Sequence, residues 1–286
     1  MKKQKNENVS YLSEVLDKLK EHKMAMAGLV VLIVEILMVV FLPMILKLDP
    51  YTSDYTAFSA TPGGAHILGT DAIGRDVFAR LMYGGRTSLL VGFVSTLISC
   101  AIGVPLGLVA GYARGKAEAV IMRIADMMLA FPGLVIALAV AGIMGASIKN
   151  AIIAIVVVSW TKYARLARSL VMKIRDRDYV SAAIVTGSKT PYMLFRYMLP
   201  NALPTLIITA ATDIGSMMLE LAAMSFLGFG AKPPAPEWGY MLNEGRACMQ
   251  SAPWLMIFPG LAIFVVVVVF NMLGDSIRDI LDPRNE

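Results

Sequence analysis

Charged residues, histidines and cysteines are scarce in this chain of 286 residues. Asp, Glu, Lys and Arg make up 16% of the sequence, whereas a soluble domain usually carries about 25%. His22 and His66 are the only imidazoles, which argues against a histidine metal site, a Ser/His/Asp triad and a Cys/His pair. Cys100 lies in an apolar run and Cys248 in a polar stretch, so no disulfide framework is expected. Metal-dependent, nucleophilic and disulfide-stabilised classes are therefore disfavoured.

The chain also lacks a phosphate-binding loop of the form G-x-x-x-x-G-K-[ST]. The stretch from Gly187 to Thr190 lacks the glycine before Lys189 and follows no predicted strand. The chain is therefore not expected to bind or hydrolyse ATP, and we predict that it is not an enzyme and binds no cofactor of its own.

Hydrophobic residues, by contrast, make up 57% of the chain. This composition predicts an all-α polytopic membrane protein. A helical span needs about 20 apolar residues, and six stretches qualify: 24–46, 88–110, 119–141, 145–164, 203–226 and 253–273. The fourth is the weakest, because its continuous apolar run covers only 151–160. An even number of spans places both termini on one side of the membrane.

The basic residues fix the orientation, because Lys and Arg accumulate on the cytoplasmic side. With the N-terminus inside, most of the 26 Lys and Arg residues are cytoplasmic. The outer side then holds only Lys47, Arg75, Arg80, Arg86, Lys149, Lys232 and Arg246. We therefore predict cytoplasmic N- and C-termini.

The predicted spans divide the chain into five parts. They are a cytoplasmic segment over 1–23, a first span over 24–46, an extracytoplasmic loop over 47–87, a membrane core over 88–274 and a cytoplasmic tail over 275–286. Within the first part, Leu12, Val15, Leu16 and Leu19 have helical spacing beside several lysines. This pattern predicts either an amphipathic helix on the membrane surface or a partly ordered tail.

The only long cytoplasmic loop, over 179–204, organises the rest of the chain. Val180, Ala183 and Ile184 recur at helical spacing before Gly187, and a second apolar series follows Pro191. We predict two short amphipathic helices joined by a glycine turn with positive φ. Such a hairpin either fits a groove on a soluble partner or packs only on its own membrane domain.

The spacing of this loop resembles the EAA loop of the membrane subunits of ATP-binding-cassette (ABC) importers. The matching residues are Ser181, Ala182, Ala183, Gly187, Leu199 and Pro200. Ser181 stands where the family has Glu, and Tyr197 stands where it has Ile. The resemblance implies a type I permease fold and a role for these residues in coupling to a separate ATPase subunit.

The first outer segment contains LGTDAIGRDVFARLMYGGRTSL, which resembles the signature of the peptide and nickel group of these permeases, and the chain resembles the C-type subunit of that group. Its apolar residues from Ile73 to Met82 predict an interfacial helix that Gly84 and Gly85 would end. The charged residues of this segment, including Asp71, form either a group-specific site or a locally paired structural cluster.

Charged residues inside the predicted spans are costly unless they are paired or wetted. Arg123 and Asp126 are three residues apart and predict a local ion pair. Asp213 and Glu220 are seven apart and share a helical face, where they either line a solute path or hydrogen-bond between helices. Glu35 is alone in the first span.

The resemblance implies a multi-pass permease subunit in a bacterial cytoplasmic membrane. The expected partners are a second homologous permease subunit, two ABC ATPase subunits that bind ATP and Mg²⁺, and an extracytoplasmic solute-binding protein. The expected substrate is a peptide, nickel or a metal chelate, and no nucleic acid is involved. The alternative is a secondary transporter that uses an intramembrane carboxylate as a proton site.

Overall fold

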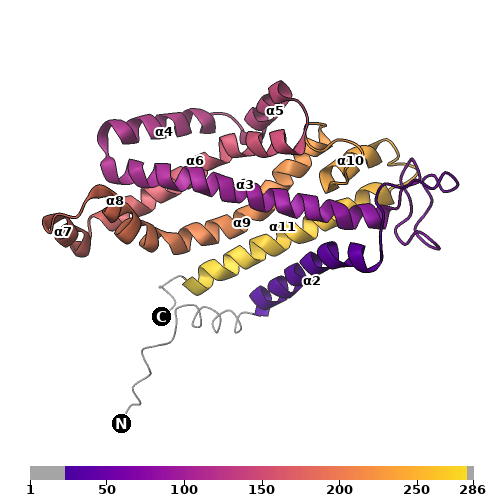
Figure 1. Ribbon diagram of the computed structural model, residues 1–286, viewed down its shortest axis with the longest axis horizontal. Helices are drawn as coiled ribbons and strands as arrows, with labels where there is room; N and C mark the ends of the chain where they lie inside the picture. The colour runs from indigo at the N-terminus through magenta and orange to yellow at the C-terminus, as the bar shows by residue number, and fades with distance from the viewer. Residues whose placement is uncertain (1–22, 282–286) are drawn as a thin grey trace, which may run out of the picture.

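The computed structural model describes residues 23–281, and these residues form a helical bundle (Figure 1). The long helices are α2 (Lys23–Ile45), α3 (Val77–Ala113), α6 (Ile148–Arg175), α9 (Leu199–Phe226) and α11 (Trp254–Leu281). Two short helices, α7 (Asp178–Val185) and α8 (Thr190–Met193), lie at one end of the bundle. The 46–76 loop and α10 (Trp238–Arg246) lie at the other end. The amphipathic helix predicted before residue 23 lies outside the described residues.

Four helical segments in the described part of the chain are long and apolar enough to cross a membrane: α2, α3, the segment Thr190–Phe226 and α11. A fifth crossing is possible if the bent pair α4 (Gly115–Leu129) and α5 (Gly133–Met144) forms one span. The predicted spans 24–46, 88–110, 203–226 and 253–273 therefore each fall largely within a helix that meets these criteria.

The predicted third span, 119–141, is not one straight helix. Between α4 and α5 the chain turns by 89°. The turn contains Pro132, which has no backbone N–H and disfavours helical geometry at Phe131. The predicted span therefore corresponds to a bent helix pair, which can cross the membrane only as one broken span.

The predicted fourth span corresponds to α6, which extends well beyond residue 164 into a basic last turn. Helix α6 carries six Lys and Arg residues and is not among the helices that are long and apolar enough to cross a membrane. It packs instead along α3, where Gly103, Gly107 and Gly111 face it. A Cβ at Gly103 would lie 2.7 Å from that of Tyr163, and one at Gly107 would lie 2.7 Å from that of Ala167. Small residues thus allow the two backbones to approach closely.

Helix α3 begins at Val77, after Asp76 caps it by accepting a hydrogen bond from the backbone N–H of Ala79 at 2.7 Å. The interfacial helix predicted to end at Gly84 and Gly85 is wrong, since α3 continues to Ala113. Both glycines face the indole of Trp238; a Cβ at Gly85 would lie 2.7 Å from that ring. They serve close packing inside a helix that extends for about 55 Å.

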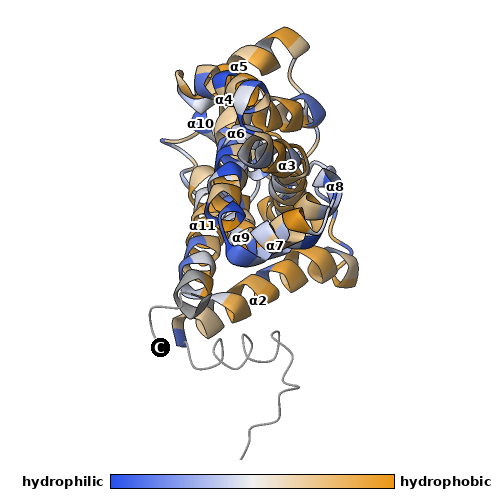
Figure 2. Cartoon of the chain, turned by 90° about the vertical axis from the view of Figure 1, so that its left-hand side faces the viewer, coloured by the Kyte–Doolittle hydropathy of each residue, from blue (hydrophilic) through white to orange (hydrophobic). Residues whose placement is uncertain are grey.

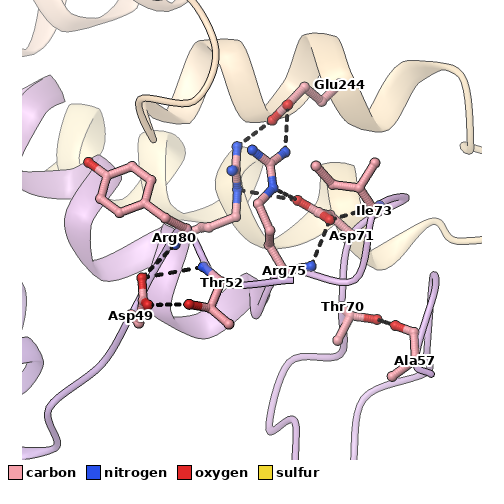
Figure 3. Close-up of polar contacts among 10 residues, drawn as sticks. Asp49, Thr52, Ala57, Thr70, Asp71, Ile73, Arg75, Arg80 and Glu244 are labelled. Atoms are coloured by element: carbon pink, nitrogen blue, oxygen red, sulfur yellow. Dashed lines mark hydrogen bonds and ion pairs between the residues drawn. The ribbon is translucent and has the colours of Figure 1, made fainter. Parts of the chain in front are cut away.

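At the end opposite α7 and α8, four charged residues form a buried network (Figure 3). Arg75 donates from Nε to Asp71 at 2.7 Å and from Nη2 to Glu244 of α10 at 2.7 Å. Arg80 of α3 donates to the other carboxylate oxygen of Glu244. Burial disfavours the charge on Arg75, but Glu244 and Asp71 outweigh it and raise the pKa of Arg75. The cluster therefore pairs locally, as the structural interpretation predicted, and also ties the loop to α10.

Glu237 fastens α10 to α3 beside this network. Its carboxylate accepts from the backbone N–H groups of Gly239 and Tyr240, both at 2.9 Å, and from the Ser88 hydroxyl at 3.0 Å. Burial raises the pKa of Glu237, although these donors act in the opposite direction. The outer cap of the bundle is consequently held by polar groups that are largely shielded from water.

Glu244→Gln should lower the stability of the protein by about 3 kcal/mol, because it removes one charge from a buried ion-pair network. Arg80 is 1% exposed and cannot be rehydrated without moving. The measurement is the midpoint of thermal unfolding in purified, detergent-solubilised protein, which should fall by roughly 5 °C or more.

Asp126→Asn is the matched control, because Asp126 and its partner Arg165 are both about half exposed. Such a pair contributes about 0–1 kcal/mol. Equal midpoints for the two variants would show that the outer network does not stabilise the fold.

Candidate functional site

The 179–204 loop forms a hairpin at one end of the bundle. Its first arm is α7, and its turn contains Gly187 with φ of 84°. This conformation is readily available to glycine and strained for most other residues. The predicted first helix and the predicted positive φ are therefore confirmed.

The second arm is not the separate short helix that the sequence predicted. Helix α8 continues through a π-helical turn, η1 (Leu194–Met198), directly into α9. Pro200 follows this turn and has no N–H to donate to a preceding carbonyl, which favours a local change of hydrogen-bond register. The side chain of Asn201 donates to the carbonyl of Tyr197 at 2.6 Å. The hairpin and the spanning helix are thus one continuous helical segment, Thr190–Phe226.

The outward surface of the hairpin is apolar although it lies at the end of the bundle. Val185 is 87% exposed, and Phe195 is 64% exposed. The other exposed apolar or aromatic side chains of this hairpin include Tyr179, Ile184 and Tyr192. A cluster of this kind on an exposed turn is typical of a protein–protein contact.

The inward surface of the hairpin packs on the ends of the long helices. Val180, Ala183, Met193 and Met198 are buried in one cluster with residues of α3 and α6, including Leu108 and Val171. The hairpin is therefore attached to the bundle by apolar packing on one side while its other side remains free in this chain.

The residues matched to the EAA loop fall on both surfaces of this hairpin. Ser181, Ala182 and Pro200 are exposed, Ala183 is buried and Leu199 is partly buried. Gly187 is exposed, and a Cβ there would have no atom within 4 Å. The structure brings these six residues together in one hairpin and places Asp213 and Glu220 apart from them, farther along α9.

A second polar region lies midway along α6 and α9. Lys162 forms an ion pair with Asp213, and the Tyr163 hydroxyl donates to the other oxygen of Asp213 at 2.8 Å. The Asp213 side chain is 5% exposed, whereas that of Lys162 is 56% exposed. The sequence analysis identified Asp213 but counted Lys162 only as a cytoplasmic basic residue. The position of Lys162 at the middle of a weakly apolar helix could have indicated that it pairs with an acidic residue on another helix.

Polar residues continue from this ion pair along one face of α9. They recur every three or four residues: Asn201, Thr205, Thr209, Asp213, Ser216 and Glu220. Glu220 is partly exposed and has no ion-pair or hydrogen-bond partner within residues 23–281. Hydrophilic residues gather over α6 and α9, whereas α2 and α5 are mostly hydrophobic (Figure 2). The predicted common face of Asp213 and Glu220 is thus part of a longer polar row.

Two other charged residues of the predicted spans differ from this pattern. Asp126 pairs with Arg165 of α6 and not with Arg123, so the predicted local pair was wrong. Glu35 borders an apolar groove between α2 and α11, and its Oε2 is buried without a partner in the part of the chain that the structure describes. The same part contains no group of three or more His, Cys, Asp or Glu residues suited to a metal ion.

Comparisons with known proteins agree with this architecture. A family model described as binding-protein-dependent transport system inner membrane component matches residues 103–286. A second, described as the N-terminal TM domain of oligopeptide transport permease C, matches residues 10–62.

Curated relatives match along nearly the whole chain. The dipeptide transport system permease protein DppC of Haemophilus influenzae is 43% identical over 93% of this chain and 92% of its own. The glutathione transport system permease protein GsiD of Pectobacterium atrosepticum is 42% identical over 93% and 88%.

An inward-facing structure of the MetNI methionine ABC transporter contains a chain similar in fold. The TM-score is 0.59 at 18% identity, and the match covers 70% of this chain and 95% of that one. Fold, family models and relatives agree, and the chain therefore belongs to the binding-protein-dependent transport system inner membrane components, which are permease subunits of ABC importers.

Proposed function

We propose that this chain is a six-span permease subunit that imports short peptides across a bacterial cytoplasmic membrane, with both termini in the cytoplasm. The observation that carries the proposal is the exposed apolar hairpin continuous with α9, the helix that bears the polar row. Such permease subunits are not enzymes themselves. The energy source is a pair of ABC ATPase subunits, which hold ATP and Mg²⁺. The remaining partners are a second, homologous permease subunit and an extracytoplasmic solute-binding protein.

A peptide is favoured over nickel or a metal chelate as the substrate. The relatives at above 40% identity include proteins named for dipeptide and glutathione transport.

Coupling is proposed to begin at the hairpin. Closure of the ATPase pair would move the surface around Val185 and Phe195, which has no cover in this chain. Because α8, η1 and α9 form one helical segment, this movement would reach Asp213 without passing through a flexible joint. The spans would thereby alternate between two arrangements, one open to the outside and one open to the cytoplasm. The polar row would be exposed to each side of the membrane in turn.

The alternative, a proton-coupled secondary transporter, has less support. Asp213 already holds Lys162 and Tyr163, so its charge is compensated within the chain. The two relatives named above are described as permease proteins of a dipeptide and a glutathione transport system.

The proposed topology places the hairpin in the cytoplasm. In a variant without Cys100 and Cys248, a new cysteine at Ser188 should not react with a membrane-impermeant maleimide in intact cells. A cysteine at Phe58, in the opposite loop and 55% exposed, should react. Labelling of the cysteine at position 188 without labelling at position 58 would show that the true topology is the reverse of the proposed one.

Gly187→Val should leave the protein in the membrane but weaken attachment of the ATPase subunits or uncouple their hydrolysis from transport, and Gly187→Ala should act more mildly. The cause is the positive φ, because a β-branched residue disfavours it. The measurement is peptide uptake and ATPase copurification at equal membrane levels.

Gly187→Asn is the matched control, because asparagine tolerates positive φ. It should retain more coupling than Gly187→Val although its side chain has a similar bulk. Ser181→Glu, which restores the family residue at an exposed position, should also be tolerated. Normal uptake and normal ATPase copurification for Gly187→Val would show that the hairpin is not the coupling element.

Asp213→Asn and Glu220→Gln should both assemble with the partner subunits and change the rate of peptide uptake. Asp213→Asn leaves Lys162 without its counter-charge, whereas Glu220→Gln removes a charge that has no partner in the described residues. Initial uptake rates in reconstituted liposomes measure the effect. Unchanged uptake rates in both variants would show that Asp213 and Glu220 have only a structural role.

A further inference from the structure

The ion pair between Lys162 and Asp213 is asymmetric in a way that suits a transient ligand. Asp213 is buried and keeps the Tyr163 hydroxyl at 2.8 Å even if the ammonium turns away. Lys162, by contrast, is more than half exposed and carries a long, flexible side chain. Its ammonium has three donors and can therefore contact a second anion while it stays paired with Asp213.

In the proposed six-span arrangement, Lys162 lies at the midpoint of the fourth span, α6, where an exposed charge is strongly disfavoured against hydrocarbon. In that arrangement its ammonium faces water or a partner subunit and not lipid. The polar row on α9 runs beside it. Both helices thus present groups that can replace the hydration of a polar solute.

Glu220 supplies the opposite charge on the same face. It lies two turns beyond Asp213 on α9, about 10 Å along the helix axis. It is partly exposed and makes no hydrogen bond or salt bridge within the described chain, although the charges of Asp213 and Lys162 are near enough to act on it. Lys162 is held at Asp213, so this axial spacing also separates its ammonium from the level of Glu220. An extended peptide covers about 3.3–3.6 Å per residue, so a chain of about three residues with free ends matches it.

We propose that Lys162 and Glu220 bind the two free termini of a short peptide during its passage. Lys162 contacts the C-terminal carboxylate while Asp213 stays bound to Tyr163, and Glu220 contacts the N-terminal ammonium. This inference rests on the proposed function as a peptide permease. It adds a specificity for zwitterionic peptides within the membrane, separate from any selectivity of the binding protein.

The test uses the complete transporter, with its binding protein, in liposomes. The substrates are trialanine, its N-acetyl form and its C-terminal amide, each supplied with saturating binding protein whose affinity for all three is measured first by calorimetry. Wild type should import trialanine faster than either blocked form. A contact to a charged group changes rates by about tenfold or more, which sets the size of the expected preferences.

The variants separate the two contacts. The double variant Lys162→Met, Asp213→Asn keeps the pair electrically balanced and should lose the preference for trialanine over the amide, but keep the preference over the acetyl form. Glu220→Gln should do the reverse. Lys162→Arg should retain the preference over the amide, and Lys173→Met, an exposed lysine farther along α6, should retain both preferences.

Two kinds of failure are distinguishable. If wild type imports all three forms equally, or if the variants slow all three by the same factor, the two residues do not read the termini and the inference is overturned. If wild type shows no ATP-dependent uptake of any peptide, the proposed function is overturned as well.

Discussion

The close contact between α3 and α6 is the constraint on which the rest of the structure depends. Helix α6 carries six Lys and Arg residues, and small residues on both helices bring it onto the glycines of α3. There, α6 buries Tyr163, Ala164 and Ala167, whereas Lys162 stays about half exposed. A protein interior cannot absorb added volume at such contacts without strain. The position of the ion pair with α9 therefore follows from three glycines on a different helix.

The two ends of the bundle are held by different forces. At the outer end, the charged network around Glu244 and the cap formed by Glu237 fix the loop and α10 against α3. At the hairpin end, the attachment is apolar and non-directional, through residues such as Met193 and Met198. Polar networks demand specific geometry, whereas methionine side chains adapt to changed neighbours. The molecule thus combines a rigid outer cap with an adaptable inner contact.

Much of the fold was predictable because its signals are local. The apolar runs at 88–110, 203–226 and 253–273 lie within helices, and the glycine turn of the hairpin has the predicted φ. The failures involve partners distant in sequence. Gly84 and Gly85 indicate a helix end until Trp238 is known to pack on them, and Asp126 prefers Arg165 to the nearby Arg123. For the same reason, local spacing identified Asp213 but not its pairing with Lys162.

The π-helical turn between α8 and α9 has a mechanical consequence. A π turn contains an extra residue relative to an α turn, so the side chains before and after it are offset around the axis by about 100°. Conversion of η1 to regular α-helix would rotate Phe195 and its neighbours relative to Asp213 while the rod itself stayed intact. A displacement of the hairpin that converted η1 in this way would therefore rotate α9 about its own axis. This geometry gives the bundle a way to change its polar face without bending any span.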